Sequence, residues 1–115
     1  MSVSYEELFT TLKLEIDNLA KSQIEIYYNE AISDGYYILA ELRNDIEDWC
    51  EMLDSGDIDA GNFKALLIDE ADQFKMMALR KAGLTVLELE DFRTAVFKLI
   101  CTTVIRVVKE SQASK

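Results

Sequence analysis

The chain has 115 residues, of which 50% are apolar and 30% are charged, and 22 acidic against 12 basic side chains give a net charge of −10. This length allows one domain, and this balance is typical of a globular chain rather than a disordered one. A surface with this much negative charge repels nucleic-acid phosphates and anionic lipid headgroups. We therefore expect no nucleic-acid partner and no membrane partner.

Proline is absent and glycine occurs only four times. Proline breaks helix interiors, so its absence favours long helices with few turns. No apolar run approaches the roughly 20 residues of a membrane span, and the first residues lack the features of a secretory signal. We therefore expect a cytoplasmic protein with a single domain over residues 1–115 and frayed ends at about 1–3 and 111–115.

The first helix is predicted to begin at Ser4. Ser4 and Glu7 have the spacing of a capping box, in which the serine side chain accepts a hydrogen bond from the amide three residues later. Apolar residues then recur at intervals of three or four, as on one face of a helix, at Tyr5, Leu8, Leu12, Ile16 and Leu19.

Two positions compete for the next break. Ser22 and Glu25 repeat the capping-box spacing, whereas Gly35, after an aspartate, could end a helix. One apolar line keeps helical spacing from Ile24 to Leu53 and passes through Gly35, which favours continuity there. Helices of matched length favour the break at Gly35. We prefer continuity, and the alternative stays open.

Residues 54–57, Asp-Ser-Gly-Asp, form the clearest turn in the chain. Asp57 or Asp59 can cap the next helix, which is expected to run to Ala82 and Gly83. One face of that helix carries Phe63, Leu66, Leu67, Phe74, Met77 and Ala78.

The last helix is predicted from about residue 86 to residue 110. Thr85 and Glu88 supply a third capping box before it, although a continuous helix through Gly83 is the alternative. The chain is therefore predicted to be all-α, an antiparallel helical bundle of three or four helices. Without breaks at Gly35 and Gly83 it would be a long helical hairpin that must dimerise to bury its faces.

The sequence offers few groups for catalysis. It has no histidine, which removes the commonest general base and a usual metal ligand. The acidic runs at 45–48 and 69–72 fall on predicted helices, where consecutive side chains diverge and cannot converge on a cation. Glu70 interrupts an apolar line, and we prefer a boundary position for it over a buried functional carboxylate. Cys50 and Cys101 are expected to be unpaired apolar residues. We expect no enzyme activity, no cofactor and no metal.

The last helix is more apolar than a surface helix. One apolar stripe of it is expected in the core, and only a narrow strip of the helix is polar. Its other apolar residues form what we call the second stripe: Phe97, Cys101, Val104, Ile105 and Val108. A helix on the outside of a bundle needs only one such stripe. Either this helix lies centrally among the others, or the second stripe is the contact of a homodimer.

Tyrosines mark another candidate surface, because they fall in the adjacent pairs 27–28 and 36–37. Adjacent helical side chains diverge, so one member of each pair is expected to leave the core, with Tyr28, Tyr36 and Tyr37 as candidate contact residues. Packing at a bend is the alternative. The acidic face within residues 41–54 could bind a basic partner, or it could simply confer solubility.

These features predict a non-catalytic protein-interaction or structural bundle that self-associates through its C-terminal helix or binds another helical protein. The alternative is an acidic regulator of a basic, nucleic-acid-binding protein. A weaker alternative is a bundle that binds a small apolar ligand.

Overall fold

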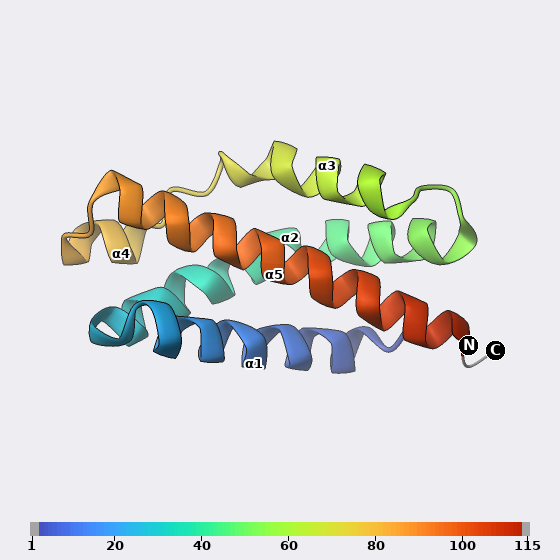
Figure 1. Ribbon diagram of the computed structural model, residues 1–115, viewed down its shortest axis with the longest axis horizontal. Helices are drawn as coiled ribbons and strands as arrows, with labels where there is room; N and C mark the ends of the chain where they lie inside the picture. The colour runs from blue at the N-terminus through green and yellow to red at the C-terminus, as the bar shows by residue number, and fades with distance from the viewer. Residues whose placement is uncertain (1–2, 114–115) are drawn as a thin grey trace.

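The computed structural model describes residues 3–113, and all of their regular structure is helical (Figure 1). The elements are α1 (Tyr5–Gln23), the 3-10 turn η1 (Glu25–Tyr27), α2 (Tyr28–Ser55), α3 (Ala60–Ala71), α4 (Met77–Ala82) and α5 (Val86–Ala113). α1 and α3 run in one direction, α2 and α5 in the other, and the short α4 lies at one end of the bundle. The predicted all-α antiparallel bundle is confirmed.

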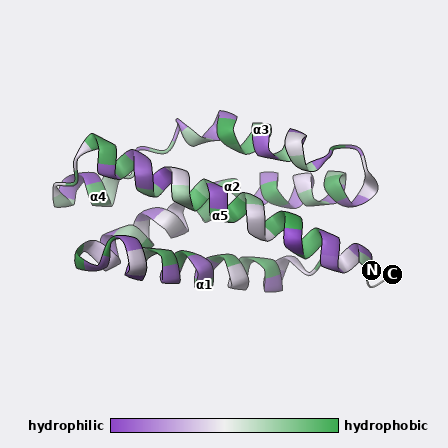
Figure 2. Ribbon diagram, in the orientation of Figure 1, coloured by the Kyte–Doolittle hydropathy of each residue, from purple (hydrophilic) through white to green (hydrophobic). Residues whose placement is uncertain are grey.

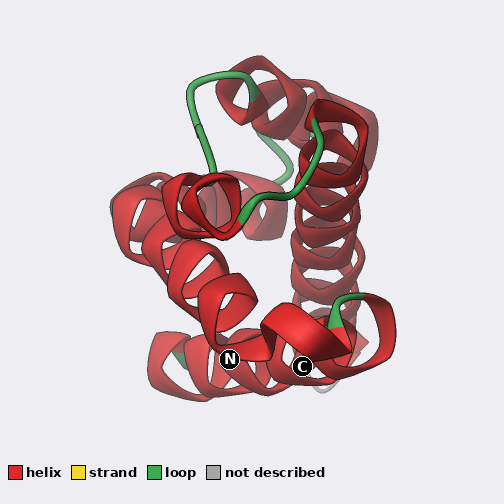
Figure 3. Cartoon of the chain, turned by 90° about the vertical axis from the view of Figure 1, so that its left-hand side faces the viewer, coloured by secondary structure: helices red, strands yellow, loops and turns green. Residues whose placement is uncertain are grey.

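α2 and α5 are the central helices of this bundle, because α5 packs against α1, α2 and α3, and α2 packs against α1, α3, α4 and α5. Hydrophobic and hydrophilic residues recur along each helix in the manner of amphipathic helices (Figure 2). Seen from the α4 end, the helices are joined only by short loops (Figure 3). Fully buried side chains from these helices form one core, which includes Leu12, Ile16, Ile38, Leu42, Ile46, Phe63, Phe92, Val96 and Ile100.

The breaks between helices lie largely where the spacing of capping and apolar residues predicted them. α1 ends at Gln23, near the Ser22 site, and α2 continues through Gly35, as preferred from the apolar line. The capping box at Ser22 does not form, because the Ser22 hydroxyl donates instead to the carbonyl of Leu19 at 3.5 Å. Gly83 ends α4 with a left-handed φ of 103°, which excludes the long-hairpin alternative.

Three helix starts are capped by side chains, as the sequence indicated. The Ser4 side chain accepts from the amide of Glu7 at 3.4 Å, and Thr85 and Glu88 form a reciprocal capping box. At α3 the cap is Asp59, whose carboxylate accepts from the amide of Asn62 at 2.8 Å. Each contact satisfies an amide that has no partner within its own helix.

The prediction of a single helix that runs to residue 82 is wrong. α3 ends at Ala71, the chain is irregular to Met76, and α4 then begins. Tertiary contacts cause the interruption: Arg93 donates to the carbonyl of Phe74 at 3.2 Å, and Phe74 packs on Phe97 with ring centroids 5.7 Å apart. Met77, expected on the buried face, is 51% exposed.

The last helix extends further than expected. Residues 111–113, which were predicted to fray, continue α5 to Ala113, and Gln112 donates to the carbonyl of Asp54 at 3.3 Å. The remaining positions expected to fray, apart from Val3, lie outside the described residues. Over the described part of the chain, no helix has both the length and the apolar character that crossing a bilayer requires.

Candidate functional site

Because α5 packs against three other helices, most of the second stripe is buried within the chain. Phe97, Val104 and Val108 are buried against the other helices of the same chain, whereas Cys101 and Ile105 are half-buried. The two apolar stripes of α5 are therefore largely covered by α1, α2 and α3, as expected for a central helix. Self-association through this helix stays a prediction, and within the second stripe only Cys101 and Ile105 offer it accessible apolar surface.

Of the three candidate tyrosines, Tyr28 and Tyr36 contact α1, whereas Tyr37 lies beside Phe74. Tyr28 donates a hydrogen bond to Asp17 across the α1–α2 contact, and this bond raises the pKa of the phenol to about 12. Tyr36 is half-buried beneath the ammonium group of Lys13, which lies 5.5 Å from its ring centroid. Tyr37 is 59% exposed, so it is the member of its pair that leaves the core.

Exposed large apolar side chains gather at the α4 end of the bundle. Of the eight such residues in the described part of the chain, five lie on η1, on the first turn of α5, on α4 itself, or on α2 beside α4, and their exposed fractions range from 51% to 88%. We call this set the α4-end surface: Ile26, Tyr37, Met77, Val86 and Leu87. Apolar surface concentrated in this way on a monomer is typical of an interaction site.

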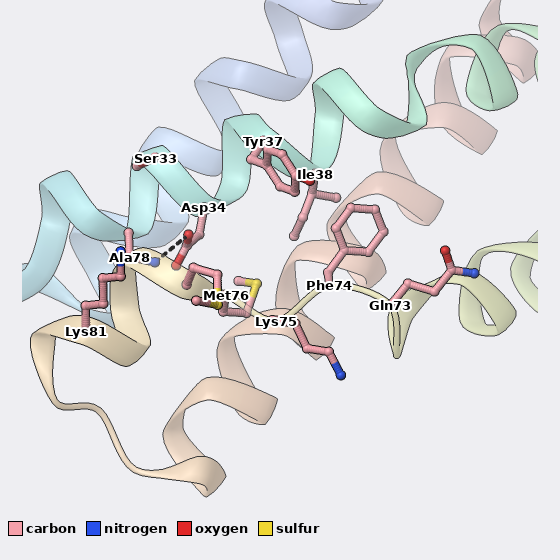
Figure 4. A pocket seen from close by; sticks show the side chains of 11 residues that line it. Ser33, Asp34, Tyr37, Ile38, Gln73, Phe74, Lys75, Met76, Ala78 and Lys81 are labelled. Atoms are coloured by element: carbon pink, nitrogen blue, oxygen red, sulfur yellow. Dashed lines mark hydrogen bonds between the residues drawn. The ribbon is translucent and has the colours of Figure 1, made fainter.

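The first hollow at this end, the lysine-rimmed groove, lies between α2 and the segment 73–81 (Figure 4). Its volume is about 550 Å³, and its apolar lining comprises Tyr37, Ile38, Phe74, Met76, Met77 and Ala78. The rings of Tyr37 and Phe74 meet edge to face, with centroids 6.2 Å apart. The polar lining comprises Ser33, Asp34, Gln73, Lys75 and Lys81.

Asp34, at the bottom of this groove, holds α4 in place against α2. One carboxylate oxygen accepts from the amide of Ala78 at 3.0 Å and the other from the amide of Leu79 at 2.8 Å, so Asp34 caps α4 across the α2–α4 contact. Met76, immediately before α4, has a φ of 52°, a left-handed conformation that is rare outside glycine. Backbone of this kind persists where the surrounding structure fixes it, and it is common at binding sites.

The second hollow, the carboxylate-rimmed groove, lies between residues 22–27 and the beginning of α5. Its volume is about 560 Å³, and Ile24, Ile26, Tyr27 and Leu84 supply its apolar lining. Three carboxylates also line it: Glu25, Glu88 and Asp91. Hydrogen bonds from Thr85 lower the pKa of Glu88, so this carboxylate stays ionised at neutral pH.

Neither groove carries an arrangement of side chains with evident catalytic use. The Asp34 carboxylate is already engaged by two amides, and within residues 3–113 no group of three or more His, Cys, Asp or Glu side chains is placed to hold a metal ion. Glu70 is half-buried on α3 and lines neither groove. Half-open hollows with apolar walls and charged rims suit the docking of a partner side chain or segment.

Sequence reasoning found Tyr37 but missed the rest of the α4-end surface. The sequence does indicate exposed apolar surface at Val86 and Leu87. Adjacent helical residues diverge by about 100°, so these two cannot both face the core that Leu89 reaches. Met77 could not be found, since its exposure follows from the interruption of the predicted helix.

Comparison of the chain with protein-family models, with curated proteins and with solved structures finds no match in any of the three.

Thiol chemistry can test what covers the second stripe. We expect a native-state alkylating reagent to modify Cys101 slowly and Cys50 not at all, as read by mass spectrometry. Burial raises the pKa of both thiols, that of Cys50 to about 12, so little reactive thiolate exists at neutral pH. Cys101 is half-exposed, whereas Cys50 is reached only on unfolding.

Modification of Cys50 without unfolding would contradict this packing. Protection of Cys101 that grows with protein concentration would place a second copy over α5.

Proposed function

We propose that this protein is a non-catalytic interaction protein that binds a protein partner through the α4-end surface. The observation that carries the proposal is the exposure of Ile26, Tyr37, Met77, Val86 and Leu87 at the end of the bundle that holds two grooves, which Ile26, Tyr37 and Met77 help to line. Large apolar side chains exposed together favour association because covering them removes apolar area from water. The contact thus lies at the α4 end, where more apolar surface is accessible than on the second stripe of α5.

The absence of histidine from the chain supports a non-catalytic role, because it leaves no side chain whose ordinary pKa lies near neutrality. We include a cytoplasmic location in the proposal, which the unpaired Cys50 and Cys101 favour. A regulator of a basic protein is the second candidate function. The observation that favours it is the carboxylate rim formed by Glu25, Glu88 and Asp91.

A photoreactive amino acid placed at Leu87 is expected to give one discrete cross-linked adduct in extracts of cells that make the protein. The matched control is Leu14, which is 60% exposed on α1 but lies outside the α4-end surface. An adduct at position 87 and none at position 14 supports the proposal. Equal cross-linking at both positions, or none at position 87, contradicts it.

A further inference from the structure

No residue lines both grooves, but the two grooves come close to each other in the chain at the end of α4. Lys81 of α4 lines the lysine-rimmed groove, and Leu84, three residues later, lines the carboxylate-rimmed groove. Three residues of chain span at most about 11 Å between Cα atoms, so the two grooves adjoin at the end of α4. A partner that covers the end of α4 therefore meets both rims.

The two rims carry opposite charges. Lys75 and Lys81 line one groove, and Glu25, Glu88 and Asp91 line the other. Within residues 3–113 none of these five side chains forms an ion pair with another residue of the chain. Asp34, the one carboxylate of the lysine-rimmed groove, is engaged by the amides of α4. Glu88 likewise accepts from the amide and the hydroxyl of Thr85, so the rim charges available to a partner are those of Lys75, Lys81, Glu25 and Asp91.

We infer that the partner is a second copy of this chain, bound in a symmetric dimer in which the lysine rim of each copy faces the carboxylate rim of the other. The inference rests on the proposed function, because it names the partner of the same α4-end surface. A two-fold symmetric contact requires a surface that is complementary to itself, with both patches beside the axis. Adjoining rims of opposite sign meet this requirement.

Charge complementarity favours this partner over an unrelated one. A basic protein would match the carboxylate rim but place like charges on Lys75 and Lys81, and an acidic protein would do the reverse. A second copy matches both rims at once. It also brings Tyr37 and Met77 from each groove toward the exposed Ile26 and Leu87 of the other copy, which removes apolar area from water.

Two charge-reversed variants test the dimer. In sedimentation velocity, the unmodified protein is expected to shift from monomer to dimer as its concentration rises. Lys75→Glu with Lys81→Glu, or Glu25→Lys with Asp91→Lys, is expected to weaken self-association at least tenfold, because each variant alone opposes like charges. An equimolar mixture of the two variants is expected to dimerise again, because each rim then meets its opposite at both contacts.

The controls separate this inference from a general effect of net charge. Lys64→Glu with Lys98→Glu changes the net charge as much as Lys75→Glu with Lys81→Glu does, on exposed residues outside both grooves, and is expected to leave dimerisation unchanged. An unmodified protein that stays monomeric at high concentration, or a mixture that fails to dimerise, overturns the inference. If the Leu87 adduct then contains a different protein, the proposed function stands without the dimer; if no adduct forms at position 87, the proposed function fails as well.

Discussion

Replacing Gly35 with alanine is expected to lower the free energy of unfolding by about 2 kcal/mol, although alanine is the better helix former. A Cβ atom at position 35 would lie 2.6 Å from Cγ2 of Ile16, far inside the normal contact distance between carbon atoms. Ile16 is fully buried and β-branched, so its χ1 angle in a helix is nearly fixed and the methyl group cannot swing away. α1 and α2 must separate instead. Thermal or denaturant unfolding measures the loss.

The magnitude follows from two opposing effects. Overpacking a core typically costs about 1–3 kcal/mol, whereas replacing glycine with alanine inside a helix recovers up to about 1 kcal/mol. We place the steric cost at the upper end, because the contact lies between two helices that pack along much of their length.

Gly61 provides the matched control for this experiment. It also lies within a helix, but it is exposed, and the nearest atom to an added Cβ is an Asp59 carboxylate oxygen at 3.4 Å. Gly61→Ala is therefore expected to leave stability unchanged or to raise it by up to about 1 kcal/mol. Adding Ile16→Leu, which removes the Cγ2 methyl, should recover part of the loss caused by Gly35→Ala. If Gly35→Ala is as stable as the unmodified protein, the close approach of α1 and α2 is not as described.

The continuity of α2 through Gly35 illustrates what the sequence could predict. The apolar line on both sides of Gly35 keeps one helical phase, and that local pattern was sufficient. The capping box at Thr85 and Glu88 was found for the same reason, since its partners lie three residues apart. What the sequence did not indicate is why position 35 is glycine. That reason lies on another helix, in the side chain of Ile16.

The interruption at residues 72–76 could not be predicted, because its causes are distant in sequence. The Phe74 carbonyl is satisfied by Arg93 on α5, and the first amides of α4 are satisfied by Asp34 on α2. Local propensity favours a continuous helix here, and tertiary contacts override it. The candidate site was missed for the same reason, since the lysine-rimmed groove exists only where that helix is broken.

The sequence alone does not determine the position of α5, for a different reason. Its two apolar stripes fit either a central helix or a dimer contact, and hydrophobic periodicity alone cannot distinguish them. Packing of α5 against three neighbouring helices accounts for most of the second stripe, including Phe97 and Val104.

Replacing Asp34 with alanine is expected to cost about 3 kcal/mol and to release α4 from the bundle. Both carboxylate oxygens accept hydrogen bonds from α4 amides, and the contact with Leu79 is buried. An unsatisfied buried donor costs about 1–3 kcal/mol, and loss of a helix cap costs a similar amount. α4 has only six residues, which is too short to be stable without external contacts. Hydrogen exchange at residues 77–82 measures the release.

Two further variants separate the cap from a general loss of stability. Asp34→Asn keeps one acceptor oxygen and is expected to lose about half as much. Asp59→Ala removes the exposed cap of α3 and should cost about 1 kcal/mol without changing exchange in α4. Because Asp34 also fixes the floor of the lysine-rimmed groove, its replacement should abolish binding at the α4-end surface while α1, α2 and α5 stay protected. Unchanged protection of residues 77–82 in Asp34→Ala would show that the α2–α4 contact, and with it the groove, depends on other interactions.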